Sequence, residues 1–149
     1  MNVDPLSRHS NPVRTNENYL RWQLGRWARQ NAPTITVLDP QDRSIALQPA
    51  ETVIARISLD APGSPLIVTD QRLVLSPDVS VWYADVEHCV WIDRDPDSKG
   101  MRKQTHFGRM VLEMAGGKEV VLEGLGQAVF PLLSFFHKKL HRYGGRVAG

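Results

Sequence analysis

The chain has 149 residues, which is enough for one domain with an appendage and for a core that needs neither disulfides nor a metal. It is 42% hydrophobic and 23% charged, which excludes a largely disordered chain, and its single cysteine, Cys89, excludes an intramolecular disulfide and a zinc site built from thiolates. The net charge of +2 divides into +3 over residues 1–31, from five arginines and two acidic residues, and −1 over the remainder. Because this remainder keeps four of its basic residues in its last dozen positions, the body is acidic and we expect no nucleic-acid partner.

The first fifteen residues predict no regular structure. Residues 1–15 contain two prolines and several polar turn formers without periodicity, so we expect a flexible arm. They lack the apolar core of a secretory signal, and no apolar run of the sequence approaches the length of a bilayer span. Together with the single cysteine, these features predict a cytoplasmic protein.

An amphipathic helix is predicted over residues 16–31, before Pro33. Leu20, Leu24 and Trp27 recur at three- and four-residue steps, while arginines fall on the other side. A helix of this length with an internal glycine is marginal on its own. We therefore expect the stripe of Leu20, Leu24 and Trp27 to dock either on the main domain or on a partner.

Residues 32–50 are predicted to be a linker, in which residues 34–38 are β-prone but short. A β-rich domain is predicted over residues 51–143. Alternating or β-branched runs predict its seven strands over residues 51–59, 65–69, 72–76, 79–83, 87–93, 106–114 and 119–123. In the first of these strands, a period of two places Val53, Ala55 and Ile57 on one face.

One amphipathic helix is predicted from Gln127 onward, packed on an open end of the sheet. Its buried face is expected to consist of Phe130, Leu133, Phe136 or His137, Leu140 and Tyr143. Gly144 and Gly145 are expected to end this helix. Residues 144–149 then form a flexible tail.

Three segments resemble a known family. Residues 66–75, with Thr69-Asp70-Gln71-Arg72-Leu73 at their centre, resemble a hairpin of bacterial pleckstrin-homology-like (GRAM-like) domains. Residues 83–86, followed by a valine-rich strand, resemble the small element after the fourth strand in the same group, and residues 48–53 are similar to the lead-in to its first strand. The resemblance covers about residues 47–142 and leaves the N-terminal helix outside.

The resemblance implies a mainly β (α+β) fold: a seven-stranded antiparallel sandwich or barrel, capped by a C-terminal helix and here preceded by the N-terminal amphipathic helix. Such a fold implies a docking scaffold, so we expect no enzyme, no cofactor and no metal site. Phosphoinositide-binding members place basic residues on the first strand and the loop after it, whereas residues 60–65 contain no lysine or arginine. Bacterial members are often associated with homo-oligomers, so self-association is implied.

Aromatic and basic residues of the N-terminal helix form the first candidate contact surface. Helical spacing places Trp22 beside Arg26 and Arg29 and near Tyr19, which is typical of a membrane-interfacial helix or of a face that meets an acidic partner. The alternative is that Trp22 packs on the acidic body while the arginines pair with its carboxylates.

Two further tryptophans form the second candidate surface. Trp82 and Trp91 lie out of phase with the apolar positions of their strands. They predict an exposed sheet patch for a partner or a second subunit. The alternative is that they lie beneath the N-terminal helix.

The remaining reactive side chains favour structural roles. His137 and His141 are four residues apart, but Lys138 stands where a zinc-binding helix of this spacing has glutamate, so we expect surface or half-buried histidines. His88 and Cys89 are neighbours on a strand and point to opposite faces. Cys89 is therefore expected to be a buried or half-buried small residue.

The sequence as a whole predicts a non-catalytic binding or scaffolding module in protein–protein interaction. Its expected partner is a second copy of itself or another protein, bound through sheet edges or through the face of Trp82 and Trp91. The alternative is a peripheral protein at the inner membrane face, held on anionic lipid by the basic-aromatic N-terminal helix.

Overall fold

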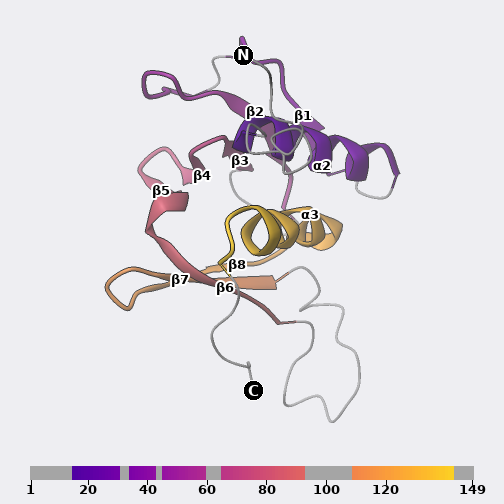
Figure 1. Cartoon of the computed structure of the whole chain (residues 1–149). Coiled ribbons are helices and arrows are strands. Elements are labelled where there is room, and N and C mark those ends of the chain that lie inside the picture. Colours follow the sequence, from indigo (N-terminus) through magenta and orange to yellow (C-terminus); the bar gives the residue numbers. More distant parts are fainter. Residues whose placement is uncertain (1–14, 31–33, 43–44, 60–64, 93–108, 143–149) are drawn as a thin grey trace, which may run out of the picture.

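Two antiparallel sheets and two helical segments make up the described part of the chain (Figure 1). The computed structural model describes residues 15–30, 34–42, 45–59, 65–92 and 109–142. Their helices and strands, in an α+β arrangement, are α2 (Asn16–Gln30), β1 (Ile35–Val37), β2 (Val53–Ile57), β3 (Leu66–Thr69), β4 (Arg72–Ser76), β5 (Val79–Trp82), β6 (Val86–Ile92), β7 (Arg109–Met114), β8 (Glu119–Leu122) and α3 (Val129–Ser134). Short 3₁₀ turns at Tyr83–Asp85 (η1) and Gly126–Ala128 (η4) and a π-helical turn at Phe135–Lys139 (η5) connect or extend them.

Every strand pairs with its neighbour along the chain within its own sheet. One sheet has the order β1-β2-β3-β4-β5, which we call sheet A, and the other has the order β6-β7-β8, which we call sheet B. The seven strands predicted from the sequence correspond to β2 to β8. β4 has the predicted bounds, β2, β3, β5 and β8 are shorter than predicted, and β6 begins one residue earlier; positions 93 and 106–108 of the predicted strands lie outside the described residues. β1 lies within the predicted linker and adds an edge strand to sheet A, opposite β2.

The hairpin turns follow from local chemistry. Between β7 and β8, Gly116 and Gly117 have φ of 91° and 88°, a left-handed conformation that favours glycine. Between β3 and β4, the Oγ1 of Thr69 accepts hydrogen bonds from the backbone N–H groups of Gln71 (3.0 Å) and Arg72 (2.9 Å). The Thr-Asp-x-Arg sequence therefore closes its own turn.

Helix α2 is part of the domain core. Thr15 caps its first turn, since the Oγ1 accepts a hydrogen bond from the Asn18 N–H at 3.1 Å. Leu20 and Leu24 are fully buried, and the Trp27 ring stacks on Phe130 with centroids 5.3 Å apart. The predicted stripe therefore docks on the main domain, and Figure 1 shows α3 between α2 and sheet B.

A guanidinium group fastens this helix to sheet A. Arg21 donates from Nη1 to the carbonyl of Leu38 at 2.8 Å and from Nη2 to the carbonyl of Val53 at 2.7 Å. Its Nε donates to Glu17 at 3.1 Å within the helix. Asn16 adds a bond from its side-chain amide to the carbonyl of Asp70. Two segments of sheet A are thus tied to the first turns of α2.

The predicted face of the C-terminal helix is confirmed at Leu133 and Phe136, which are buried, but it is incomplete and the predicted length is wrong. Val129, Leu132, Phe135 and Phe136 are fully buried, whereas Phe130 is only partly buried. The helix consists of the short α3 followed directly by the π-helical turn η5. A π-helical turn inserts one residue into the helical repeat and so shifts the buried face. The chain then leaves the helix at His141, whose φ is 59°; the predicted position 143 lies outside the described residues.

A bulge in β2 changes the predicted alternation. The pairing of β2 with β3 shifts register between Val53 and Ala55. Val53 therefore belongs to a small cluster with Leu38, Ile67 and Val74, whereas Ala55 lies in the main core. A bulge opposes two residues to one and rotates the side chains that follow, so Val53 and Ala55 do not share a face.

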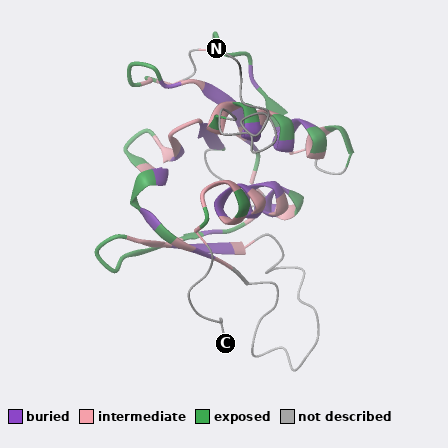
Figure 2. Cartoon of the chain, viewed as in Figure 1, coloured by how far each residue is buried: buried purple, intermediate pink, exposed green. Residues whose placement is uncertain are grey.

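The main core fills the space between the sheets and the helices. Figure 2 shows most of α3 as buried and the β7–β8 turn as exposed. Aromatic rings lie at the centre: Tyr83 meets Phe135 and Phe136 with centroids 4.8 and 5.7 Å apart. No helix within the described residues combines the length and the apolar character that crossing a membrane requires.

Candidate functional site

A buried ionic network lies at the turn of the β3–β4 hairpin. The Nε of Arg72 donates to Glu51 at 2.8 Å, and the Oγ1 of Thr69 donates to the same carboxylate at 2.7 Å. The Glu51 side chain is fully buried, and that of Arg72 is 12% exposed. The remaining donors of Arg72 bond Ser80 and the carbonyl of Ala46. The network is mostly internal, so it supports the hairpin.

The ionisation of the network follows from its hydrogen bonds. Burial by itself would raise the pKa of the Glu51 carboxyl, but hydrogen bonds from Arg72, the Gln48 backbone and Thr69 outweigh burial and hold that pKa below its ordinary value of 4.5. Burial raises the pKa of Asp70, which accepts the backbone N–H of Thr52 at 2.8 Å. Glu51 therefore stays ionised, as a structural counterion.

The outer face of α2 presents an aromatic ring and two guanidinium groups. Trp22 is 49% exposed, and the Arg26 guanidinium lies 5.5 Å from its ring centroid. Arg29 is exposed one turn further on. Tyr19, in contrast, is 9% exposed and shares a hydrogen bond of 2.7 Å with the Ser134 hydroxyl. We call Trp22, Arg26 and Arg29 the helix face.

The outer face of sheet B carries a row of valines between charged rows. Cross-strand register places Val90 opposite Val111 and Val111 opposite Val121. Val121, on the edge strand β8, is 41% exposed, Val90 is half-buried and Val111 between them is 7% exposed; Met110 and Leu112 are fully buried on the inner face. We call Val90, Val111 and Val121 the valine row.

Carboxylates flank the valine row on both sides. Glu113 lies opposite Glu119 on one side, with His88 3.3 Å from Glu113. On the other side Glu123 lies 3.7 Å from Arg109. Among the described residues, three carboxylates and one guanidinium lie on this face, so its charge is opposite in sign to that of the helix face.

The two tryptophans of the second candidate surface are not placed together. Trp82 is half-buried, and the Arg72 guanidinium lies 4.7 Å from its ring centroid on the outer side of sheet A. Trp91 belongs to sheet B, where its backbone lies opposite Met110, but its side chain lies outside the described part. Of these two side chains the structure therefore places only Trp82, which packs on Arg72 of the buried ionic network.

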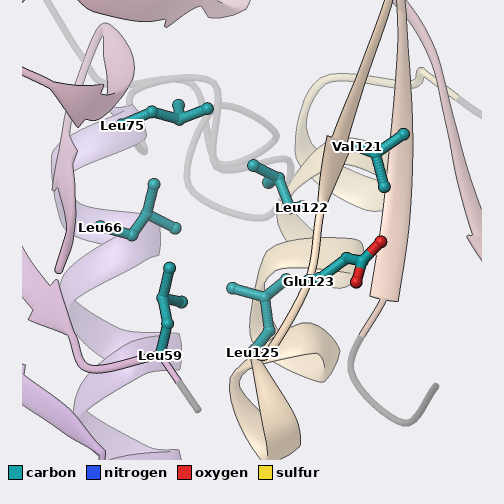
Figure 3. Close-up of a pocket in the computed structure, with 7 residues that line it drawn as sticks. All are labelled: Leu59, Leu66, Leu75, Val121, Leu122, Glu123 and Leu125. Carbon is teal, nitrogen blue, oxygen red and sulfur yellow. The ribbon is translucent and has the colours of Figure 1, made fainter. Parts of the chain in front are cut away.

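A gap between the two sheets forms an apolar pocket of about 200 Å³. Figure 3 shows Leu59, Leu66 and Leu75 pointing from sheet A toward Leu122 and Leu125, while Val121 and Glu123, which also line it, point away. Its volume is below the range of about 300–1,000 Å³ for ligand pockets. We therefore interpret the pocket as a packing gap of the core and not as a ligand site.

The surroundings of His137, His141 and Cys89 indicate structural roles for these side chains. His137 lies half-buried with its Nε2 2.8 Å from the carbonyl oxygen of Cys89, and His141 is exposed beyond the helix. Cys89 is fully buried, as predicted, and burial raises the pKa of its thiol. Among the residues that the structure describes, no three His, Cys, Asp or Glu side chains are grouped to hold a metal ion.

The valine row is the feature that sequence reasoning missed. Each valine alternates with a buried residue in its own strand, which is a visible signal, but the row exists only through the register of three strands. The helix face, in contrast, followed directly from the spacing of Trp22, Arg26 and Arg29.

No protein-family model matches the sequence, and no significant match was found among curated proteins or solved structures. The surfaces described above therefore carry the functional argument.

Proposed function

We propose that the chain is a non-catalytic binding module with a pleckstrin-homology-like architecture, and that it associates with a second copy of itself, helix face to sheet face. The succession of β2 to β8 followed by a helix supports the architecture. The proposed self-association rests on the complementarity of the helix face and the valine row.

The two faces match in chemistry. Trp22 supplies an exposed aromatic ring, and tryptophan and arginine are the residues that most often dominate protein interfaces. Val121 supplies an exposed apolar contact for that ring, and carboxylates lie beside it on the same face as possible partners of Arg26 and Arg29. Opposite net charges also speed the encounter of the two copies.

The two faces also match in length. From Trp22 to Arg29 the helix rises by about 10 Å. From Glu119 to Glu123 the strand rises by about 13 Å. Ring and guanidinium groups can thus engage the valine row and its flanking carboxylates at the same time.

Because the two faces are different surfaces of one molecule, the contact is head-to-tail. Each copy then has one face of each kind to offer, and this allows a selective test. We expect Trp22→Ala to disable the helix face, and Val121→Arg to disable the valine row, with the core retained, since Trp22 is 49% exposed and Val121 41%.

The experiment is light scattering coupled to size exclusion over a range of concentrations. The unmodified chain should associate, and each single variant should weaken association by roughly thirtyfold, the effect of truncating a tryptophan worth about 2 kcal/mol. An equimolar mixture of the two variants should form dimers that do not grow further, because one intact face remains on each copy.

Val79→Arg is the matched control, since Val79 is 49% exposed on the edge strand β5 of the other sheet. It should leave association unchanged. A monomeric wild-type chain at every concentration, loss of association in Val79→Arg, or failure of the mixture to form dimers would each overturn this interface.

A second candidate, binding to anionic membranes, rests on the same stacked pair of Trp22 and Arg26. It predicts salt-sensitive flotation with anionic vesicles that is lost in Trp22→Ala and retained in Val121→Arg. Self-association requires both faces, so the two variants separate the candidates.

A further inference from the structure

A second concave surface lies on the outer side of sheet A, away from the helix face and the valine row. The chain before β2 crosses this side, where Leu38 joins Val53, Ile67 and Val74 in a small apolar cluster. Ile45 and Leu47 pack against that cluster. The crossing covers part of the sheet and leaves a hollow beside it.

The hollow has a volume of about 520 Å³, within the range typical of small-molecule sites. Its apolar wall is formed by Ile45, Pro65, Ile67, Val74 and Pro77. Ile67 and Val74 are directly opposite each other on β3 and β4, so they form a fixed floor. The hollow is thus built on paired strands.

Two guanidinium groups line the hollow, and they differ in what they already bind. Arg72 is engaged by Glu51, Ser80 and the carbonyl of Ala46. The Arg56 guanidinium, half-buried on β2, makes no ion pair or hydrogen bond with any other residue that the structure describes. Within the described part of the chain, Arg56 is therefore a cation without a counterion beside an apolar wall.

The charge of the lining selects the ligand. No acidic side chain is among the described residues that line the hollow. The charge of Arg72 is already neutralised by its ion pair with the buried Glu51. One positive charge remains, on a planar fork that matches a carboxylate through two parallel hydrogen bonds. A phosphate dianion would require further cations, which the described residues of this lining do not supply.

We propose that the hollow binds a small amphipathic monocarboxylate, with its carboxylate on Arg56 and its hydrocarbon part on Ile67, Val74 and Pro77. This site is independent of the proposed self-association. The Ser76 hydroxyl at the rim can donate to the same carboxylate.

The test is a titration of the full ¹⁵N-labelled chain with decanoate, followed by backbone and arginine side-chain NMR signals and by calorimetry. We expect saturable shifts at Arg56, Ile67 and Val74. Arg56→Gln should weaken binding by roughly ten- to a hundredfold, because it removes a charged hydrogen-bond donor pair. Arg56→Lys should be intermediate, since an ammonium keeps the charge but lacks the fork.

A filling variant tests the site without touching its charge. Ala46 is exposed and lines the hollow, and only its backbone carbonyl bonds Arg72. Ala46→Phe should therefore block decanoate while the fold and Arg56 stay in place. Lys118→Gln, an equal change of charge in the exposed β7–β8 turn, should bind decanoate like the unmodified chain.

The ligand's own charge supplies the remaining control. Decyltrimethylammonium has the same alkyl chain and the opposite sign, and it should not bind. Equal binding of the two ligands, undiminished binding by Arg56→Gln, or shifts centred on the leucine-lined pocket between the sheets would overturn the proposal.

Discussion

Arg72 is the residue on which most of the hairpin chemistry depends. Its guanidinium neutralises a carboxylate that is fully buried, bonds a hydroxyl and a carbonyl, and covers the Trp82 ring. Removing one partner of a buried ion pair leaves the other charge without compensation. The Thr69-Asp70-Gln71-Arg72 turn is therefore a stability element, in agreement with its internal position.

We predict that Arg72→Met lowers the free energy of unfolding by about 3–5 kcal/mol at neutral pH. Urea denaturation monitored by tryptophan fluorescence measures this change. Glu51→Gln in the Arg72→Met background should recover a large part of the loss, because it removes the stranded charge. A double variant less stable than Arg72→Met would contradict the assignment.

The same prediction has a defined dependence on pH. The folded pKa of Glu51 lies below its ordinary value of 4.5, so in the unmodified chain its ionised form stabilises the fold above that value, and this stabilisation is lost as the pH falls through the folded pKa. In Arg72→Met the buried Glu51 carboxylate has no cation beside it, so its protonation stabilises the folded state. The difference in stability between the two chains should therefore shrink as the pH falls below 4.5.

At the scale of elements, α2 depends on a polar attachment as much as on its apolar stripe. Arg21→Ala should destabilise the chain by about 2–3 kcal/mol, because the carbonyls of Leu38 and Val53 lose a charged donor. Arg29→Ala removes an exposed arginine from the same helix and should cost about 0.5 kcal/mol or less.

Hydrogen exchange of the α2 amides measures where the Arg21 effect acts. Exchange should accelerate in the first turns of α2 in Arg21→Ala and stay unchanged in Arg29→Ala. Equal effects of the two substitutions would show that the attachment contributes nothing specific.

Sequence periodicity predicted the existence of elements better than the faces they bury. β2 to β8 follow from alternating runs and turn residues, because these signals are local. The bulge at Val53 and the π-helical turn η5 each add one residue to a regular repeat, and tertiary packing decides where. A fixed period therefore misassigned the face of Val53, missed the fully buried Val129, Leu132 and Phe135, and misplaced the end of the C-terminal helix.

The candidate surfaces divide in the same way. Trp22, Arg26 and Arg29 lie on one helix, so their spacing alone places them on one face. The valine row needs the register of β6, β7 and β8, and the hollow beside Arg56 needs the crossing of residues 45–46 over sheet A. Neither relation is local, and neither could be predicted from one sequence.

At the scale of the whole molecule, the N-terminal helix is inseparable from the β-rich body. Leu20 and Leu24 are fully buried in the same cluster as the inner residues of both sheets. Deleting residues 1–31 therefore removes core side chains along with the helix face. Truncating one buried leucine to alanine costs about 2–5 kcal/mol. The loss of both is therefore comparable with the whole free energy of unfolding of a typical domain, about 5–15 kcal/mol.

We predict that the chain without residues 1–31 loses cooperative thermal unfolding and binds a dye specific for exposed apolar surface. Circular dichroism and dye fluorescence measure these properties. Trp22→Ala, which leaves the buried stripe intact, should melt cooperatively like the unmodified chain. A truncated chain with a sharp melting transition would contradict the integral role of α2.

The bond between the hydroxyls of Tyr19 and Ser134 joins residues that are 115 positions apart. During synthesis at about 5–20 residues per second, the helix emerges roughly ten seconds before its packing partner exists. For that time the leucines of α2 have no core to enter, and closing such a long stretch slows the last step of folding. The apolar face of α2 therefore leaves the ribosome well before the residues that bury it.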